Sequence, residues 1–362
     1  MVSGSSGGDT ARPVSADGGE ALLGRVLDGR YRIHAVLGTG GVGVVYRAEH
    51  TALARPVAIK VLHGYFGERE DLRLRFEREA KVLSALAHPH IVAITDYGVA
   101  EGMPYLAMEL LEGCTLAELL RERGPLAPET ALDIARGILR GLAFAHARGV
   151  LHRDLKPANV FLQRLPDDPY HVKLLDFGLA KMVEPDDEEV DELTLTRSGT
   201  VLGTPAYMSP EQASGATVDA PTDVYSAGCV LYELFGGQPP FRAETRPELI
   251  RKHMLSPVRS LAEIREGAQP SPELEAVLEK ALAKDPRERF ADAGEMLAAV
   301  DALPRPPMAG VGGTTLPARE SGAHPRGRDA SEAPTVRRGA GTGAQPQAPA
   351  GASPERRPFG WV

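Results

Sequence analysis

Cysteine and tryptophan are scarce in this sequence, which has two cysteines and one tryptophan among 362 residues. Cys114 and Cys229 lie far apart in apolar surroundings, without a second cysteine or a histidine at metal-binding spacing. The sequence therefore lacks the pattern of a disulfide framework and that of a zinc site. We expect both cysteines to be small buried hydrophobes in a reducing compartment.

Long apolar runs and an excess of basic residues are also missing. No run approaches the roughly 18 uninterrupted apolar residues of a candidate membrane-spanning helix. The N-terminal stretch MVSGSSGGDTARPVSADGG lacks the basic start and apolar core of a secretory signal. The net charge of −8 argues against a general nucleic-acid-binding protein, which usually carries a basic face. We therefore expect a cytoplasmic protein with no membrane span and no nucleic-acid partner.

The remaining composition is that of a soluble folded protein with unstructured ends. Hydrophobic residues make up 43% and charged residues 25% of a chain long enough for one large or two medium domains. Residues 1–24 are rich in Gly, Ser and Ala, and residues 304–362 are rich in Pro, Gly, Ala and Arg. Neither segment can bury enough apolar area to fold alone. We predict a disordered leader over 1–24, a folded domain over 25–303 and a disordered tail over 304–362.

Residues 152–159, HRDLKPAN, place a carboxylate, an ammonium and an amide on one short loop. Transfer of a phosphoryl group to a hydroxyl needs these three kinds of group together. Asp154 can accept the proton of the acceptor hydroxyl, Lys156 can neutralise the moving phosphate, and Asn159 can offer its side-chain oxygen to Mg²⁺.

The strand-like residues 172–175 then deliver Asp176-Phe177-Gly178. A carboxylate there can be the main Mg²⁺ ligand, because Mg²⁺ prefers one or two carboxylates together with phosphate oxygens. A lone Asp or Asn would more often satisfy the backbone of a loop. Two motifs in this order make that alternative weak.

These two motifs resemble the catalytic core of a eukaryotic-type serine/threonine protein kinase of the bacterial branch. The resemblance covers roughly residues 31–303 and implies an α+β, bilobal fold with a β-rich N-lobe over about 31–109 and a helical C-lobe over about 112–303. It implies ATP and Mg²⁺ as cofactors and protein substrates as acceptors. Lys156-Pro157 after Asp154 suits Ser/Thr acceptors, whereas tyrosine kinases usually carry an Ala-Arg type of sequence there.

Gly38, Gly40 and Gly43 lie between two strand patterns. Glycines at this spacing let backbone N–H groups approach phosphate oxygens. Because a strand rather than a helix follows, a dinucleotide-binding Rossmann turn is disfavoured. The resemblance implies a lid over ATP, with Val42 in place of the aromatic residue frequent at its tip; a plain hairpin turn is the alternative.

Lys60 lies in the apolar strand over residues 57–62, where an unpaired ammonium would be costly. The resemblance implies the nucleotide phosphates and Glu79 as its partners. Glu79 lies in an amphipathic helix predicted over 69–87, although a solvated Glu is the default in so charged a helix. The predicted inward side of that helix comprises Leu72, Phe76, Val82, Leu83 and Leu86.

The resemblance also implies an adenine pocket. Met108 stands at its back, and Glu109 to Leu111 form the hinge between the lobes. Leu37, Val45, Ala58 and Phe161 sandwich the adenine ring, although all four are equally good core residues without a ligand.

The second half of the domain reads as helical. Predicted helices cover residues 116–123, 128–147 (capped by Gly149), 223–234, 248–254, 272–282 and 293–303. Asp223 is either a helix N-cap or, by resemblance, the residue that holds the backbone of the catalytic loop. The resemblance pairs Glu211 with a buried Arg289, for which a surface Arg is the alternative.

The segment between Gly178 and Pro210 carries an acidic block with seven acidic residues over 184–192, which we predict to be disordered. Thr196, Ser198 and Thr200 follow it as candidate phosphorylation sites, and Arg153 is the predicted partner of a phosphate there. In the tail, Thr314, Thr315 and Thr335 are candidate autophosphorylation sites that would recruit phosphothreonine-binding partners. Phe359 and Trp361 form a short docking peptide or have no role.

Two alternatives to an active protein kinase stay open. A catalytically inactive scaffold of the same fold is disfavoured because all the implied catalytic residues are present. A small-molecule phosphotransferase is disfavoured because that class lacks the Ser209-Pro210-Glu211 substrate segment, in which Ser209 replaces a commoner Ala.

Overall fold

The computed structural model describes residues 21–40, 43–63, 70–178, 205–265 and 270–304, which lie in one compact unit. Its strands are β1 (Val26–Leu27), β2 (Tyr31–Thr39), β3 (Gly43–His50), β4 (Arg55–Leu62), β5 (Ile94–Ala100), β6 (Met103–Glu109), β7 (Gly113–Thr115), β8 (Val160–Gln163) and β9 (His171–Leu174). Its α-helices are α1 (Glu70–Ser84), α2 (Leu116–Arg123), α3 (Pro128–His146), α6 (Pro210–Ala213), α7 (Ala220–Gly236), α8 (Arg246–Leu255), α9 (Leu261–Ile264), α10 (Pro272–Ala281) and α11 (Ala293–Asp301), and its 3-10 turns are η2 (Pro157–Asn159), η3 (Pro205–Tyr207) and η4 (Pro286–Glu288).

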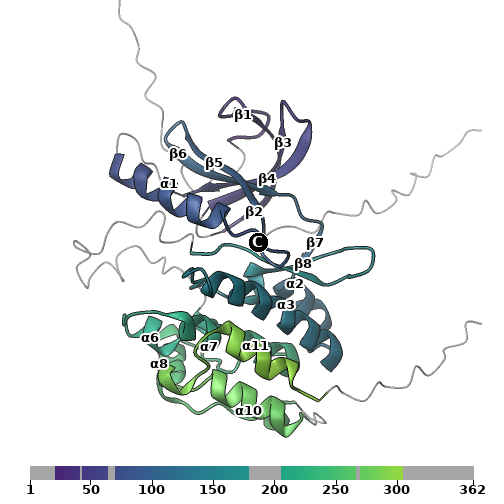
Figure 1. Ribbon diagram of the computed structural model, residues 1–362, viewed down its shortest axis with the longest axis vertical. Helices are drawn as coiled ribbons and strands as arrows, with labels where there is room; N and C mark the ends of the chain where they lie inside the picture. Colours follow the sequence, from purple (N-terminus) through teal and green to yellow (C-terminus); the bar gives the residue numbers. More distant parts are fainter. Residues whose placement is uncertain (1–20, 41–42, 64–69, 179–204, 266–269, 305–362) are drawn as a thin grey trace, which may run out of the picture. The chain divides into compact units, whose positions relative to one another are not determined.

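Within this unit the strands gather at one end and most of the helices at the other (Figure 1). The predicted α+β class, with a β-rich N-lobe and a helical C-lobe, is confirmed. In the described part of the chain, no helix combines the length and the apolar character needed to cross a membrane.

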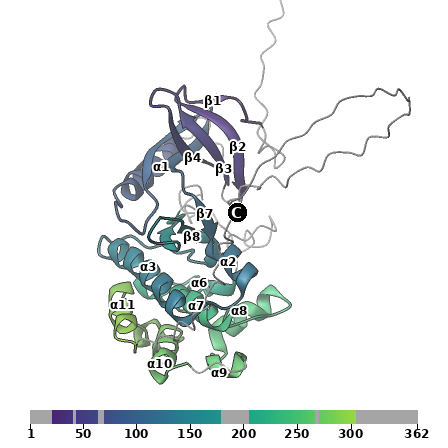
Figure 2. The same ribbon diagram turned by 90° about the vertical axis from the view of Figure 1, so that its right-hand side faces the viewer.

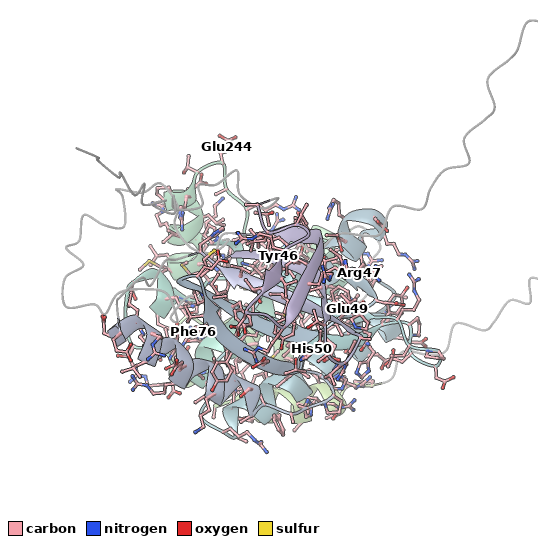
Figure 3. The ribbon with its side chains drawn as sticks, turned by 90° about the horizontal axis from the view of Figure 1, so that it is seen from above. Tyr46, Arg47, Glu49, His50, Phe76 and Glu244 are labelled. Carbon is pink, nitrogen blue, oxygen red and sulfur yellow. The ribbon has the colours of Figure 1, made fainter. Side chains whose placement is uncertain are left out.

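The N-lobe is built on an antiparallel sheet in the order β1-β2-β3-β4-β6-β5. Its central strand β4 is buried on both faces because successive side chains alternate along a strand. Val57 and Ile59 join an apolar cluster with β1 to β3, whereas Ala58 joins the larger cluster that includes Phe76 of α1. Seen from above, Phe76 lies beside the sheet, while Tyr46 and its neighbours lie along β3 (Figure 3).

The ordered domain begins before the predicted boundary at residue 24. Residues 21–24 form a turn, and Leu22 is only 4% exposed in the N-lobe core. The Gly24 N–H donates to the Ile33 carbonyl at 3.0 Å, which fixes the turn on β2. The prediction was wrong for these residues because two adjacent leucines, Leu22 and Leu23, carry no periodic signal.

The predicted helices appear within three residues of their predicted ends. Three details were wrong. Val82 of α1 is 43% exposed, since Phe76, Ala80 and Leu83 form the buried side. The apolar run over residues 91–94 predicts a strand that begins at residue 91, whereas β5 begins at Ile94. The cap of α3 is Ala147, with Gly149 left-handed two residues later at φ 71°.

A smaller sheet, β7-β8-β9, lies between the N-lobe sheet and the helices (Figure 2). Helix α3 comes unusually close to β9 because two of its residues are glycines. A Cβ on Gly137 would lie 2.8 Å from the Val172 side chain, and one on Gly141 would lie 2.7 Å from Leu174. The predicted burial of cysteine holds for Cys229, while Cys114 is half-buried; neither forms a disulfide.

Candidate active site

The loop between α3 and β8 brings three predicted catalytic groups together. Lys156 Nζ donates to Asp154 Oδ2 at 2.8 Å, and Asn159 Nδ2 donates to the Asp154 backbone oxygen at 2.8 Å and to Oδ2 at 3.1 Å. Pro157 starts the short turn η2, which carries Asn159 back toward Asp154. The Asp154 carboxylate is therefore held on one oxygen, while its side chain stays 42% exposed toward an incoming group.

The carboxylate of Asp223, on α7, holds the backbone of this loop in place. It accepts the His152 N–H at 2.7 Å, the Arg153 N–H at 2.8 Å and His146 Nε2 at 2.9 Å. Complete burial raises the pKa of Asp223, but the bonds from His146 and the loop outweigh this effect and leave the pKa below its usual value. The alternative role as N-cap is wrong, because Asp219 caps α7.

Lys60 and Asp176 form an ion pair across the lobes. Lys60 is 6% exposed, and its Nζ lies 2.5 Å from Asp176 Oδ2. The carboxylate supplies the anionic partner that a buried ammonium needs. Glu79 lies on the exposed side of α1, and it makes no hydrogen bond or ion pair with another described residue. The structure thus brings Lys60 to the predicted metal ligand rather than to Glu79.

Phe177 anchors the turn that carries Asp176. It is 4% exposed, and its ring lies 4.6 Å from that of His152. Burial lowers the pKa of the His152 imidazole, against the nearby carboxylates of Asp223, Asp154 and Asp176, which raise it. Phe177 and Asp176 also line a small, mostly apolar pocket, together with Leu83, Leu86, Ile91, Val92, Ile94, Leu106 and Met108.

The predicted adenine residues share one apolar cluster. Ala58, Met108, Leu111 and Phe161 are buried in it, and Leu37 and Val45 pack against it. The glycine turn connects β2 to β3, and Gly38 of β2 pairs with Val45 of β3, which packs against this cluster. The Gly40 N–H donates to the Gly43 carbonyl at 2.9 Å, and a Cβ on Gly43 would collide with the Val61 carbonyl oxygen. Gly43 is therefore required for the close approach of β3 to β4. Val42 lies outside the described residues.

The Glu109 side chain contributes to the hinge rather than to the pocket. It accepts from the Ala93 N–H at 2.8 Å and from Lys173 Nζ at 2.7 Å. Lys173 lies on β9, three residues before Asp176, so this pair joins the hinge to the strand that delivers the metal ligand. Sequence reasoning missed Lys173, because a lysine in a short strand carries no signal of its partner.

Helix α6, which carries Glu211, is anchored on the C-lobe. Arg289 forms two bonds with Glu211, at 2.8 and 2.9 Å, and Thr222 adds a third at 2.7 Å. Burial raises the pKa of Glu211, but the bonds from Arg289 and Thr222 outweigh it, so that the pKa lies below its usual value. The surface alternative for Arg289 is wrong, since this residue is 4% exposed.

Arg153 Nε is buried and has no hydrogen-bond partner among the described residues. Its predicted phosphate-bearing partners, Thr196, Ser198 and Thr200, lie outside the described residues, as do the acidic block, the leader up to residue 20 and the tail from residue 305.

The sequence pattern of the protein kinase domain matches residues 31–300. The chain is 41% identical over 276 residues to the serine/threonine-protein kinase PknB of Mycolicibacterium smegmatis and 38% identical over 285 residues to the serine/threonine-protein kinase pkn3 of Myxococcus xanthus. These alignments cover 75% and 78% of this chain but 42% and 52% of the relatives, so the chain spans about half or less of their length.

Solved structures show the same similarity. The PknI kinase domain of Mycobacterium tuberculosis superposes with a TM-score of 0.59 and 28% identity, over 77% of this chain and 96% of that one. A structure of Rad53 residues 1–466 in complex with AMP-PNP superposes with a TM-score of 0.60 and 27% identity, over 74% and 64% of the two chains.

Proposed function

Because the chain belongs to the protein kinase family, we propose that it is an ATP-dependent serine/threonine kinase that phosphorylates proteins in bacterial signalling. The observation that carries this proposal is the assembly of Asp154, Lys156 and Asn159 on one loop, beside the ion pair of Lys60 with Asp176.

The side chains around the cleft suit ATP and Mg²⁺. Asp176 and Asn159 offer the carboxylate and amide oxygens that Mg²⁺ accepts, Lys60 offers a buried cation for phosphate oxygens, and the tight glycine turn offers backbone N–H groups. When bound, Mg²⁺-ATP supplies the phosphoryl group and neutralises its charge. The apolar cluster around Ala58 and Phe161 suits the flat adenine ring.

The protein's own groups would then orient the acceptor. The free side of the Asp154 carboxylate accepts the proton of a Ser or Thr hydroxyl and directs its oxygen. Lys156, already 2.8 Å from Asp154, places positive charge beside the transferred group. Positioning and charge, rather than a covalent intermediate, account for the catalysis.

Lys60 must leave Asp176 to serve the nucleotide. We assign Glu79 as its partner in that state, as the resemblance implies, and Asp176 then becomes free for the metal. Movement of α1 toward the sheet would bring the exposed Glu79 inward. In this proposal the ion pair of Lys60 with Asp176 belongs to the state without nucleotide, in which neither the phosphates nor the metal occupies these two side chains.

Activation would come from phosphorylation of Thr196, Ser198 or Thr200. The buried Nε of Arg153, which has no hydrogen-bond partner in the described part of the chain, is a ready donor for a phosphate. A phosphate accepts charge-assisted bonds better than the carboxylates of the acidic block. Phosphatase-treated and ATP-preincubated enzyme should therefore differ in rate on a peptide. The difference should vanish when all three residues are changed to Ala; equal rates throughout would contradict it.

The tail and the location of the protein complete the proposal. Phosphorylated Thr314, Thr315 or Thr335 would recruit phosphothreonine-binding partners, and the chain would act in the cytoplasm. Phosphopeptide mapping after incubation with ATP tests the sites directly.

The central experiment incubates the purified full chain with radiolabelled ATP and Mg²⁺. Casein or a myelin-type protein should be labelled on Ser and Thr, and small hydroxylated compounds should not. Asp154→Asn and Asp176→Asn should abolish labelling while the melting temperature stays near that of the wild type. No labelling of any protein by the wild type would indicate a scaffold, and labelling of small molecules alone would indicate a different phosphotransferase.

A further inference from the structure

Gln212 of α6 connects the substrate segment to the catalytic loop. Its side-chain Nε2 donates to the Arg153 carbonyl at 2.7 Å, while its Oε1 accepts the Ser209 N–H at 3.1 Å. The Gln212 N–H in turn donates to Ser209 Oγ at 3.3 Å, which completes a capping box on the short helix. A single amide thus serves both the helix start and a loop 59 residues away in sequence.

The partners determine which way the amide points. The Ser209 N–H is a donor and requires the amide oxygen, whereas the Arg153 carbonyl is an acceptor and requires the NH₂ group. A glutamate could fill the capping half of this arrangement, as in ordinary capping boxes. It could not donate to Arg153 in its ionised form. The glutamine is therefore needed for the contact with the loop rather than for the helix.

The Arg153 carbonyl belongs to the peptide that leads into Asp154. Arg153 has a left-handed φ of 65°, a conformation that residues with a side chain adopt only when their surroundings impose it. Asp223 accepts the Arg153 N–H, and Gln212 donates to the Arg153 carbonyl, so C-lobe residues fix both backbone polar groups of Arg153. The orientation of the next residue, Asp154, follows from that of the peptide.

We propose that Gln212 is a positioning residue. It fixes the orientation of the peptide between Arg153 and Asp154 and so holds the Asp154 carboxylate in place relative to the substrate segment. The same unit explains the serine at 209: an alanine there would remove the Oγ that accepts the Gln212 N–H and loosen the side chain that reaches the loop. The inference rests on the proposed kinase activity.

The test is Gln212→Glu in the full chain, because this exchange keeps the capping acceptor and, in the ionised form, replaces the donor to the Arg153 carbonyl with a charged acceptor. Glu118→Gln is the matched control: Glu118 caps α2 in the same kind of box, and its side-chain hydrogen bonds within the described part of the chain go to Thr115 rather than to the catalytic loop. We expect Gln212→Glu to lower kcat on a peptide about tenfold, with the KM for ATP and the melting temperature near wild type. Glu118→Gln should leave kcat unchanged.

Acidification supplies a readout that a purely structural role would not move. The protonated form of the introduced carboxyl can donate to the Arg153 carbonyl, and partial burial beside that carbonyl raises its pKa above the ordinary value of about 4.3. The kcat of Gln212→Glu relative to wild type should therefore rise as the pH falls from 8 to 5.5. If the charged variant fails to fold, Gln212→Met, which also lacks the donor, must show the same fall in kcat.

A wild-type kcat in the variant, an equal fall in the Glu118→Gln control, or a ratio that stays constant with pH would overturn the inference. Absence of activity in the wild-type protein would instead contradict the proposed kinase function. The two failures are thus distinguishable.

Discussion

Removal of Arg289 should destabilise the C-lobe by an amount that its contacts define. The side chains of Arg289 and Glu211 are 0% and 8% exposed. All five N–H donors of Arg289 are used: two on the Glu211 carboxylate and three on the backbone carbonyls of Ala283, Pro221 and Lys284. In Arg289→Ala, the carboxylate stays buried with Thr222 as its remaining side-chain donor, and three carbonyls lose a bond.

Breaking one side of a buried pair costs about 3–5 kcal/mol. In a domain of this size each kcal/mol corresponds to roughly 2–4 °C, so the melting temperature should fall by on the order of 10 °C. Calorimetry measures this fall, and Arg287→Ala is the matched control, because the side chain of Arg287 is 89% exposed in its pair with Asp285. The control should melt nearly as the wild type does.

Two further measurements test the reasoning. The pKa of Glu211 lies below its usual value, so its stabilising contribution is present above the unfolded pKa, near 4.5, and is lost as the pH falls through the folded pKa. The deficit of Arg289→Ala should therefore shrink as the pH drops below about 4.5. The double variant Glu211→Leu, Arg289→Met should recover much of the loss. The assignment of Arg289 and Glu211 as a stabilising buried pair would be refuted if Arg289→Ala lost less than about 1 kcal/mol of stability. It would also be refuted if the losses of the two single variants simply added in the double variant.

Three other predictions follow from burial and close approach. Leu22→Ala, or a chain that begins at residue 25, should lose about 2–4 kcal/mol in denaturant unfolding, whereas a chain beginning at residue 21 should not. Burial raises the pKa of Glu233, although the hydrogen bond from Tyr207 lowers it. Ionisation of Glu233 therefore lowers the stability of the folded protein as the pH rises through the folded pKa. Glu233→Gln should raise the melting temperature at pH 8 and have no effect near pH 4. Gly141→Ala should cost about 1–3 kcal/mol, because the added Cβ would lie 2.7 Å from Leu174, and unfolding curves compared with wild type will measure it.

Local spacing explains why much of the site was predictable. Asp154, Lys156 and Asn159 lie within six positions on one loop, so their residue types alone imply that they meet. Long-range pairs are different: the contact of Asp223 with the loop came from the family resemblance and not from any pattern in the residues. The partner of Lys60 was expected to be Glu79, but the position of α1 relative to the sheet depends on tertiary packing, and the structure has Asp176 instead.

The sequence did not predict the role of side chains that bond to backbone atoms or that belong to short elements. Gln212 sits on a four-residue helix, and its acceptor is a carbonyl that no residue type reveals. Lys173 and Leu22 are similar, since one residue in a short strand or turn has no periodicity. A polar side chain next to a recognised motif is the signal that could have identified Gln212.

Backbone strain in the described part of the chain is distributed in a way that fits the proposed chemistry. Five residues other than glycine have a positive φ: Asp28, Ala54, Glu101, Arg153 and Asp176. The first three lie at N-lobe turns, whereas the last two flank the cleft. A left-handed residue with a side chain costs about 1–2 kcal/mol, which other contacts must offset.

For Arg153 the offset comes from Asp223 and Gln212, and for Asp176 it comes from Lys60. Each support reaches the cleft from a distant segment of the chain, so the arrangement of the site depends on the packing of both lobes. A partial loss of packing should therefore release these two residues first. Activity should be lost at a lower denaturant concentration than secondary structure, and coincident loss of the two signals would contradict this order.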